Sequence, residues 1–101
     1  MKKIFISQPM KGLTDKDIIV NRKFAIEQIK KQFGNDVIII DSFFENYNPD
    51  GGSIPLKYLS KSIELLADAD AAYFCTGWDM ARGCKIEHQC AVEYGITRIY
   101  E

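Results

Sequence analysis

Short apolar runs alternate with longer amphipathic segments along this chain, and the alternation constrains its fold more than any other feature. The short runs are rich in β-branched and aromatic side chains and predict strands at residues 3–7, 37–40, 71–75 and 97–100. The longer segments predict helices at residues 15–33, 55–67 and 81–94. Strands that alternate with helices form parallel sheets through right-handed crossovers. We therefore expect an α/β fold, with a doubly wound parallel sheet of four to five strands in three α/β/α layers.

Local signals support this pattern. Thr14 and Asp17 form a capping box at the start of the first helix, and Gly34 marks its end. The run Val37–Ile40 has no polar side chain, which suits a strand covered on both faces. No repeat, linker or low-complexity stretch interrupts the pattern, so we expect one domain over residues 1–101.

Composition bears on the partners, the location and the metal content that we expect of this protein. The 13 basic and 14 acidic side chains leave a net charge of -1, which gives no general attraction to nucleic acid or to a membrane. The first residues contain no signal-peptide core. Three cysteines without a C-x-x-C pair predict reduced thiols and a cytoplasmic protein. Cys84 and His88 would give a metal only two ligands, so we expect no metal. We also expect no cofactor.

The predicted topology also places a binding site. In doubly wound sheets, ligands bind beyond the carboxyl ends of the strands, where the strand order reverses. With the order 2-1-3-4, the loops over residues 8–13 and 76–80 would face one crevice, together with the start of the third helix.

Glu87 is the one charged side chain in the apolar stripe of the predicted third helix. At about 100° per residue, the side chains within about 60° of Glu87 are all uncharged: Met80, Gly83, Cys84, Cys90, Ala91 and Tyr94. A carboxylate in an apolar stripe is costly to bury unless it is paired or hydrogen-bonded. Glu87 is therefore either a structural carboxyl bonded to a tyrosine hydroxyl or backbone amides, or a group kept for chemistry. A catalytic carboxylate would need hydrogen bonds, and the candidate donors are Ser7, a tyrosine hydroxyl and the backbone amides around Gly83.

Three segments carry a family resemblance: ISQPMKGL at the first strand, LADADAAYF at the third, and GWDMARGCKIEHQCAVEYGI after it. They resemble the nucleoside 2-deoxyribosyltransferase superfamily, in particular its small bacterial and phage branch. The pattern G-W-x-x-x-R-G-x-x-x-E-H is the most specific part, and the likeness covers nearly the whole chain. It implies a flavodoxin-like sheet and homo-oligomers. It also implies cleavage of the N-glycosidic bond of a nucleoside or nucleoside monophosphate, by deoxyribosyl transfer or hydrolysis.

The resemblance assigns the nucleophile to Glu87, which would form a glycosyl-enzyme that a second base or water resolves. Two positions depart from the family pattern. Active members carry an aspartate where this chain has Ser62, and an Asp or Ser where it has Ala81. Asp79, two residues earlier, would substitute as a catalytic group if the loop bends. Without such partners a general acid is missing, and the alternative is a non-catalytic module that binds a nucleoside or nucleotide.

Other residues near the crevice are candidate substrate ligands, each with a plainer alternative. Trp78 would stack on a base or at a subunit contact, or is a half-buried aromatic. Arg82 and Gly83 would hold a phosphate at the helix start, or Arg82 is solvated. Asp79 is also a candidate N-cap. The loop after the first strand would wrap a base or ribose, or is a plain turn. Its candidate residues are Ser7, Gln8, Pro9, Met10 and Gly12.

Small size and loop aromatics predict self-association. A chain of 101 residues buries a modest core. Aromatic side chains fall in loops that we expect to be exposed, and clustered exposed aromatics indicate an interface. These are Phe43, Phe44, Tyr47 and Trp78. The first three, with Tyr58, would alternatively form a lid over the site.

Overall fold

The computed structural model describes residues 1–44 and 46–101 and has strands and helices in strict alternation. The order is β1 (Lys2–Ser7), α1 (Asp15–Phe33), β2 (Val37–Ile40), α2 (Ile54–Leu66), β3 (Ala71–Phe74), α3 (Arg82–Glu93) and β4 (Thr97–Tyr100). Each of these elements lies within one residue of its predicted bounds. A short 3-10 helix, η1 (Trp78–Met80), occupies what was predicted as a loop.

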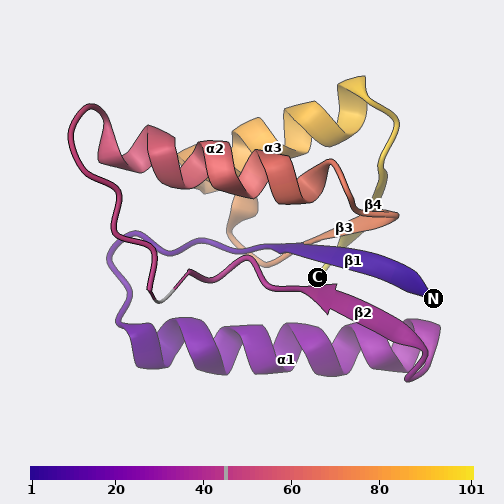
Figure 1. Ribbon diagram of the computed structural model, residues 1–101. Helices are drawn as coiled ribbons and strands as arrows, with labels where there is room; N and C mark the ends of the chain where they lie inside the picture. Colours follow the sequence, from indigo (N-terminus) through magenta and orange to yellow (C-terminus); the bar gives the residue numbers. More distant parts are fainter. Residues whose placement is uncertain (45) are drawn as a thin grey trace.

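The four strands are parallel, in the order β2-β1-β3-β4. Lys2 of β1 pairs with Val37 of β2, and Ile4 of β1 pairs with Ala71 of β3. Helix α1 covers one face of the sheet, and α2 and α3 cover the other (Figure 1). The predicted three-layer, flavodoxin-like fold is therefore confirmed. The strand order reverses between β1 and β3, which is where ligands bind in such sheets.

Each face of the sheet has its own core, because side chains alternate along a strand. The core under α1 contains Ile4, Ile6, Ala25, Ile29, Ala71, Tyr73 and Cys75. The core under α2 and α3 contains Phe5, Leu66, Ala72, Phe74 and Ala91. The alternation continues to the end of β1, so Ser7 points toward α3 and Gln8 points toward α1.

Strand β2 is covered on one face and only partly on the other, whereas we predicted cover on both faces. Val37 and Ile39 pack on the core under α1, and Ile40 packs on the core of the opposite face, but Ile38 on that face is 42 % exposed. Strand β2 is an edge strand, and the buried residues of that second core come from β1 and β3 rather than from β2. None of the helices in the described part of the chain is long and apolar enough to cross a membrane.

Helix α1 begins as predicted. The Thr14 hydroxyl accepts a hydrogen bond from the Asp17 amide at 3.1 Å, and the Asp17 carboxylate accepts one from the Thr14 amide at 3.3 Å. This reciprocal capping box satisfies two backbone donors that a helix start otherwise leaves unpaired.

Candidate functional site

Glu87 lies on the face of α3 that packs against the sheet and is only 7 % exposed. The Ser7 hydroxyl, at the carboxyl end of β1, donates a hydrogen bond of 2.6 Å to Glu87 Oε1. Cys84 and Ala91, on the same face of α3, are also buried. The predicted burial of this carboxyl is therefore confirmed, and its hydrogen-bond donor is a strand-end serine.

Burial also determines the charge of Glu87. Loss of hydration raises the pKa of its carboxyl to about 7, while the hydrogen bond from Ser7 and the nearby Ser62 hydroxyl act in the opposite direction. Near neutral pH the group therefore populates both the carboxylate and the carboxylic acid. A carboxyl tuned to this range in a cleft suits nucleophilic or acid–base chemistry.

An open cavity of about 240 Å³, which we call the Glu87 pocket, gives access to this carboxyl. Its walls come from both strand ends and both covering helices on that face: Gln8 and Met10 after β1, Phe43 and Phe44 after β2, Tyr58 and Ser62 on α2, and Gly83 and Cys84 on α3. Among the described residues that line the pocket, Glu87 is the only carboxyl. The pocket thus combines one acid with largely apolar and aromatic walls.

Four of the predicted binding residues meet at this pocket. Ser7 bonds to Glu87, and Gln8, Met10 and Gly83 line the cavity. Gln8 is itself buried, and its side-chain amide donates to the Ile18 carbonyl at 3.1 Å. Gln8 is therefore held rigidly at the strand end, while Met10 and Gly83 form the mouth and wall.

The other loop candidates lie elsewhere. Pro9 lies against Gly77 and lines a smaller cavity together with Cys75 and Thr76. Gly12 is exposed with φ +81, a left-handed conformation that glycine adopts freely. Neither residue lines the Glu87 pocket; both lie in the loop between β1 and α1.

Trp78 also lies outside the Glu87 pocket. Its ring stacks on His88, with centroids 4.1 Å apart, and packs against Phe74 and Tyr100 at 5.5 and 5.8 Å. His88 Nε2 lies 2.7 Å from the Tyr100 hydroxyl. The structure therefore places Trp78 in a half-buried aromatic cluster beside β4. His88 belongs to this cluster, whereas Cys84 lines the Glu87 pocket, and the described residues contain no group of three potential metal ligands.

Asp79 and Arg82 are both exposed and do not line the pocket. The interpretation of Asp79 as the N-cap of α3 is wrong, because Ala81 holds that position and makes no side-chain cap. The cause is η1, which takes up residues 78–80 and moves the start of α3 past Asp79. Two members of the predicted apolar stripe, Met80 and Tyr94, flank α3 and are 85 % and 83 % exposed.

The model of one protein family spans almost the entire chain. This family, described as a domain of unknown function (DUF4406), matches residues 2–100. The chain belongs to the DUF4406 family. A comparison with curated proteins gave no match. The DUF4406 match contains every element from β1 to β4, so Ser7 and Glu87 both lie inside the family's domain.

The aromatic side chains that follow β2 in this DUF4406 domain are packed rather than exposed. Phe43, Phe44 and Tyr47 are half-buried, which corrects the expectation that they lie free in a loop. Phe44 and Tyr47 pack against Tyr58 of α2, with ring centroids 6.5 and 5.1 Å away. The Tyr58 hydroxyl donates to the Tyr47 carbonyl at 2.6 Å and so ties this segment to α2. Phe43 and Phe44 thereby form one wall of the Glu87 pocket.

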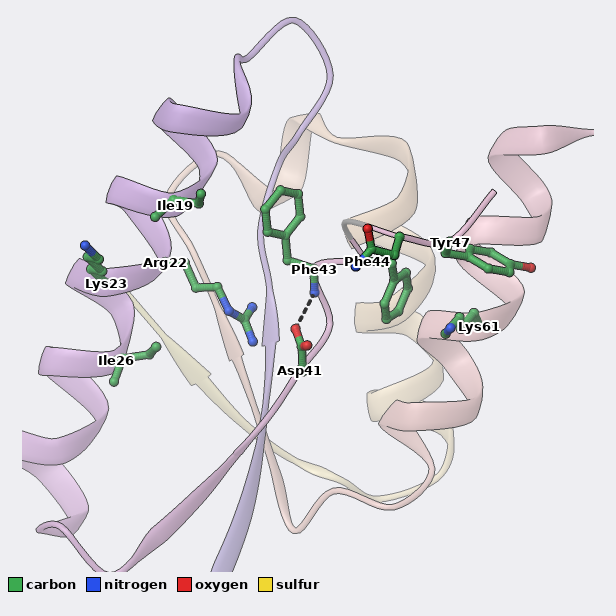
Figure 2. Close-up of a pocket in the computed structure, with 10 residues that line it drawn as sticks. Ile19, Arg22, Lys23, Ile26, Asp41, Phe43, Phe44, Tyr47 and Lys61 are labelled. Atoms are coloured by element: carbon green, nitrogen blue, oxygen red, sulfur yellow. Dashed lines mark hydrogen bonds between the residues drawn. The ribbon is translucent and has the colours of Figure 1, made fainter. Parts of the chain in front are cut away.

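A second cavity of the DUF4406 domain, of about 710 Å³, adjoins the first and was not predicted from the sequence. We call it the Arg22 pocket; Figure 2 shows Arg22 reaching into it from α1, toward Asp41 and Phe43. A signal for Arg22 did exist in the sequence. Arg22 lies four residues after Ile18 and three before Ala25, so it falls on the buried face of α1. A charge in that stripe is the same kind of anomaly as Glu87.

Proposed function

We propose that this DUF4406 domain cleaves the N-glycosidic bond of a nucleoside or nucleoside monophosphate, by hydrolysis or deoxyribosyl transfer, with Glu87 as the nucleophile. The observation that carries the proposal is a single carboxyl, with a pKa of about 7, buried in an open pocket at the switch point of the sheet. The resemblance of three segments to the nucleoside 2-deoxyribosyltransferase superfamily also supports it, because that resemblance implies that Glu87 stands at the position of the superfamily's nucleophile.

The geometry suggests a role for each oxygen of the carboxylate. Ser7 donates to Oε1, which leaves Oε2 for attack at the anomeric carbon. A new bond between Oε2 and that carbon forms as the bond to the base nitrogen breaks, and the electron pair leaves with the base, which takes a proton from water. Water or a second base then attacks the same carbon, gives up a proton to the hydroxide left by the first step, and releases the Glu87 carboxylate. Water gives the free sugar, and a second base gives a new nucleoside.

The second candidate function is a binding module without turnover, and one observation favours it. Retaining enzymes that cleave glycosidic bonds place a second carboxyl near the nucleophile to protonate the leaving group. Ser62 faces Glu87 from α2, and among the described residues of the Glu87 pocket no second carboxyl is present. On this alternative, the domain binds the nucleoside or nucleotide and releases it intact.

One experiment separates the two functions. The protein is incubated with a panel of nucleosides and nucleoside monophosphates, with and without a second free base, and released base is measured by chromatography. The matched pair of variants is Glu87→Gln, which removes the buried charge, and Glu93→Gln, which removes an exposed one from the same helix. Cleavage that is lost only in Glu87→Gln supports the proposed enzyme. Binding of panel members without release of base by the wild type supports the binding module.

We also propose that the protein self-associates, but through exposed apolar side chains other than the loop aromatics that the sequence indicated. The large exposed apolar side chains include Val20 and Phe24 on α1, and Met80 and Tyr94 at the two ends of α3. Of these, Val20 and Phe24 are neighbours one helical turn apart, and contiguous exposed apolar side chains are typical of interfaces. Light scattering that finds only an 11.5 kDa species at high micromolar concentration would contradict a homo-oligomer. The three cysteines are free thiols, in keeping with the proposed cytoplasmic location.

A further inference from the structure

The Arg22 pocket concentrates positive charge in a chain whose net charge is -1. Among the residues that the structure describes, three cations line it, Arg22, Lys23 and Lys61, against one carboxylate, Asp41. The Asp41 carboxylate accepts a hydrogen bond of 3.2 Å from the Phe43 amide and is exposed to solvent. The described part of the lining is therefore net positive, which favours an anionic occupant.

The contacts of Arg22 point to the same chemistry. Its guanidinium donates to the Ile40 carbonyl at 2.8 Å, the Ser42 hydroxyl at 3.1 Å and the Gln8 side-chain oxygen at 3.4 Å. All three acceptors are uncharged. Burial lowers the pKa of Arg22, and the charge of Asp41 only partly opposes that effect. A half-buried cation held in place by neutral acceptors is ready to pair with an anion from outside.

Lys61 extends the positive surface from the opposite wall. Its ammonium lies 4.8 Å from the ring centre of Phe44 and 4.4 Å from that of Tyr47, so two cation–π contacts hold it over the rings. Figure 2 shows Arg22 entering from α1, while Lys61 lies with Phe44 and Tyr47 on the α2 side. An anion in this pocket would lie between two cations from different helices.

The Arg22 pocket and the Glu87 pocket meet at the end of β1. Ser7 bonds to Glu87 on one face of the sheet, and the next residue, Gln8, bonds to Arg22 on the other face. Adjacent Cα atoms are only about 3.8 Å apart. Phe43 and Phe44 line both cavities. The two cavities therefore adjoin at these two rings.

We infer that the Arg22 pocket binds the phosphate of a nucleoside monophosphate whose sugar lies at Glu87. The position of the sugar rests on the proposed function, whereas the phosphate site rests on Arg22 and Lys61 alone. This site differs from the helix start at Arg82 that the sequence suggested. Arg82 is exposed and lines neither cavity.

The test measures binding rather than turnover. Isothermal titration calorimetry is carried out on Glu87→Gln protein with each of the four common 2′-deoxynucleosides and with its 5′-monophosphate, and inorganic phosphate is added as a competitor. We expect at least one monophosphate to bind about tenfold or more tightly than its nucleoside, the factor that one charge-assisted hydrogen bond supplies. The preference should shrink as salt concentration rises, because exposed charge pairs are screened.

Three variants test the residues. Lys61→Gln should reduce the phosphate preference about threefold or more, and Arg22→Gln should abolish it. Lys85→Gln, which removes an exposed lysine of α3, should leave it unchanged. Arg22 also forms hydrogen bonds with Ile40 and Ser42, so its replacement could unfold the protein, and circular dichroism is recorded to check the fold of Arg22→Gln. If Arg22→Gln is unfolded, the test of the phosphate site rests on Lys61→Gln.

The outcomes separate this inference from the proposed function. Equal affinity for nucleosides and monophosphates, no binding of any monophosphate, or a preference that survives Lys61→Gln and a folded Arg22→Gln would overturn the phosphate site. Competition by inorganic phosphate against the monophosphate supports it. A clear monophosphate preference without any cleavage by the wild type supports the phosphate site and contradicts the enzyme. Cleavage of nucleosides and monophosphates at equal rates and with equal affinity supports the enzyme and contradicts the phosphate site.

Discussion

The Ser7 hydroxyl holds Oε1 of Glu87 across 2.6 Å, although the two residues lie 80 positions apart in the sequence. Ser7 also lowers the pKa of Cys84, but burial prevails and raises the pKa of this thiol to about 11. Cys84 therefore stays protonated at neutral pH and is a poor nucleophile. Of the two groups beside Ser7, only Glu87 has a substantial ionised fraction near pH 7.

Replacement of Ser7 by Ala should raise the pKa of Glu87 above 7, because the hydrogen bond that favours the carboxylate is lost while burial remains. A ¹³C NMR titration of the Glu87 side-chain carboxyl measures this directly and needs no substrate. Ser60→Ala, an exposed change on α2, serves as the control. An unchanged or lower titration midpoint in Ser7→Ala would contradict this account of the Ser7–Glu87 contact.

The stability of the protein should fall as pH rises from about 4.5 to 7. The pKa of Glu87 is about 7 in the folded protein against an ordinary 4.5, so the unfolded chain loses this proton first. The resulting loss is about 3 kcal/mol, fully developed above pH 7. Glu87→Gln has no proton to lose at this position, and its amide oxygen can still accept from Ser7.

We therefore expect the melting temperature of Glu87→Gln, relative to wild type, to increase between pH 5 and pH 8. Thermal denaturation followed by circular dichroism measures it at both pH values. Glu93→Gln, at the exposed end of α3, should show no such trend. A difference between Glu87→Gln and wild type that stays constant with pH would mean that Glu87 titrates normally.

Ser62→Asp should restore a proton donor for the leaving base. Ser62 faces the Glu87 carboxyl from α2, so an aspartate there would put two carboxyls close together, which raises the pKa of the pair and supplies an acid. General acid catalysis of this kind contributes about a hundredfold or more to a rate. Release of free base, measured by chromatography, should increase accordingly. Ser62→Asn has the same shape but no acid, and equal rates for the two variants would rule out a missing acid.

Tyr58→Phe should loosen the aromatic wall of the Glu87 pocket. It removes the 2.6 Å hydrogen bond to the Tyr47 carbonyl, which is worth about 1 kcal/mol. For a chain of this size, that corresponds to a melting temperature lower by about 4–8 °C. Tyr94→Phe, at an 83 % exposed position, should leave the melting temperature nearly unchanged. Equal effects of the two changes would show that the Tyr58 hydroxyl does not stabilise this segment.

Two charged residues show how far the sequence could predict the site. Glu87 was found because it is the single charge in an apolar stripe of its helix, and Arg22 of α1 carries the same signal. Helical periodicity identifies such residues but says nothing about their partners. Trp78 shows the limit of this kind of prediction, because an aromatic side chain in a loop beside the switch point can turn toward a ligand or toward β4. Its orientation toward β4 follows from its packing against His88 and Phe74.

The sequence by itself determined the order of strands and helices, the capped start of α1 and the burial of Glu87. These follow from side-chain periodicity and local hydrogen bonds, which act over a few residues. Only the tertiary structure decided that Ser7 meets Glu87, that Ser62 faces the same carboxyl, and that Phe43 and Phe44 line two adjoining pockets. Such contacts join segments far apart in the chain, and they depend on how the helices and loops pack once the sheet has formed.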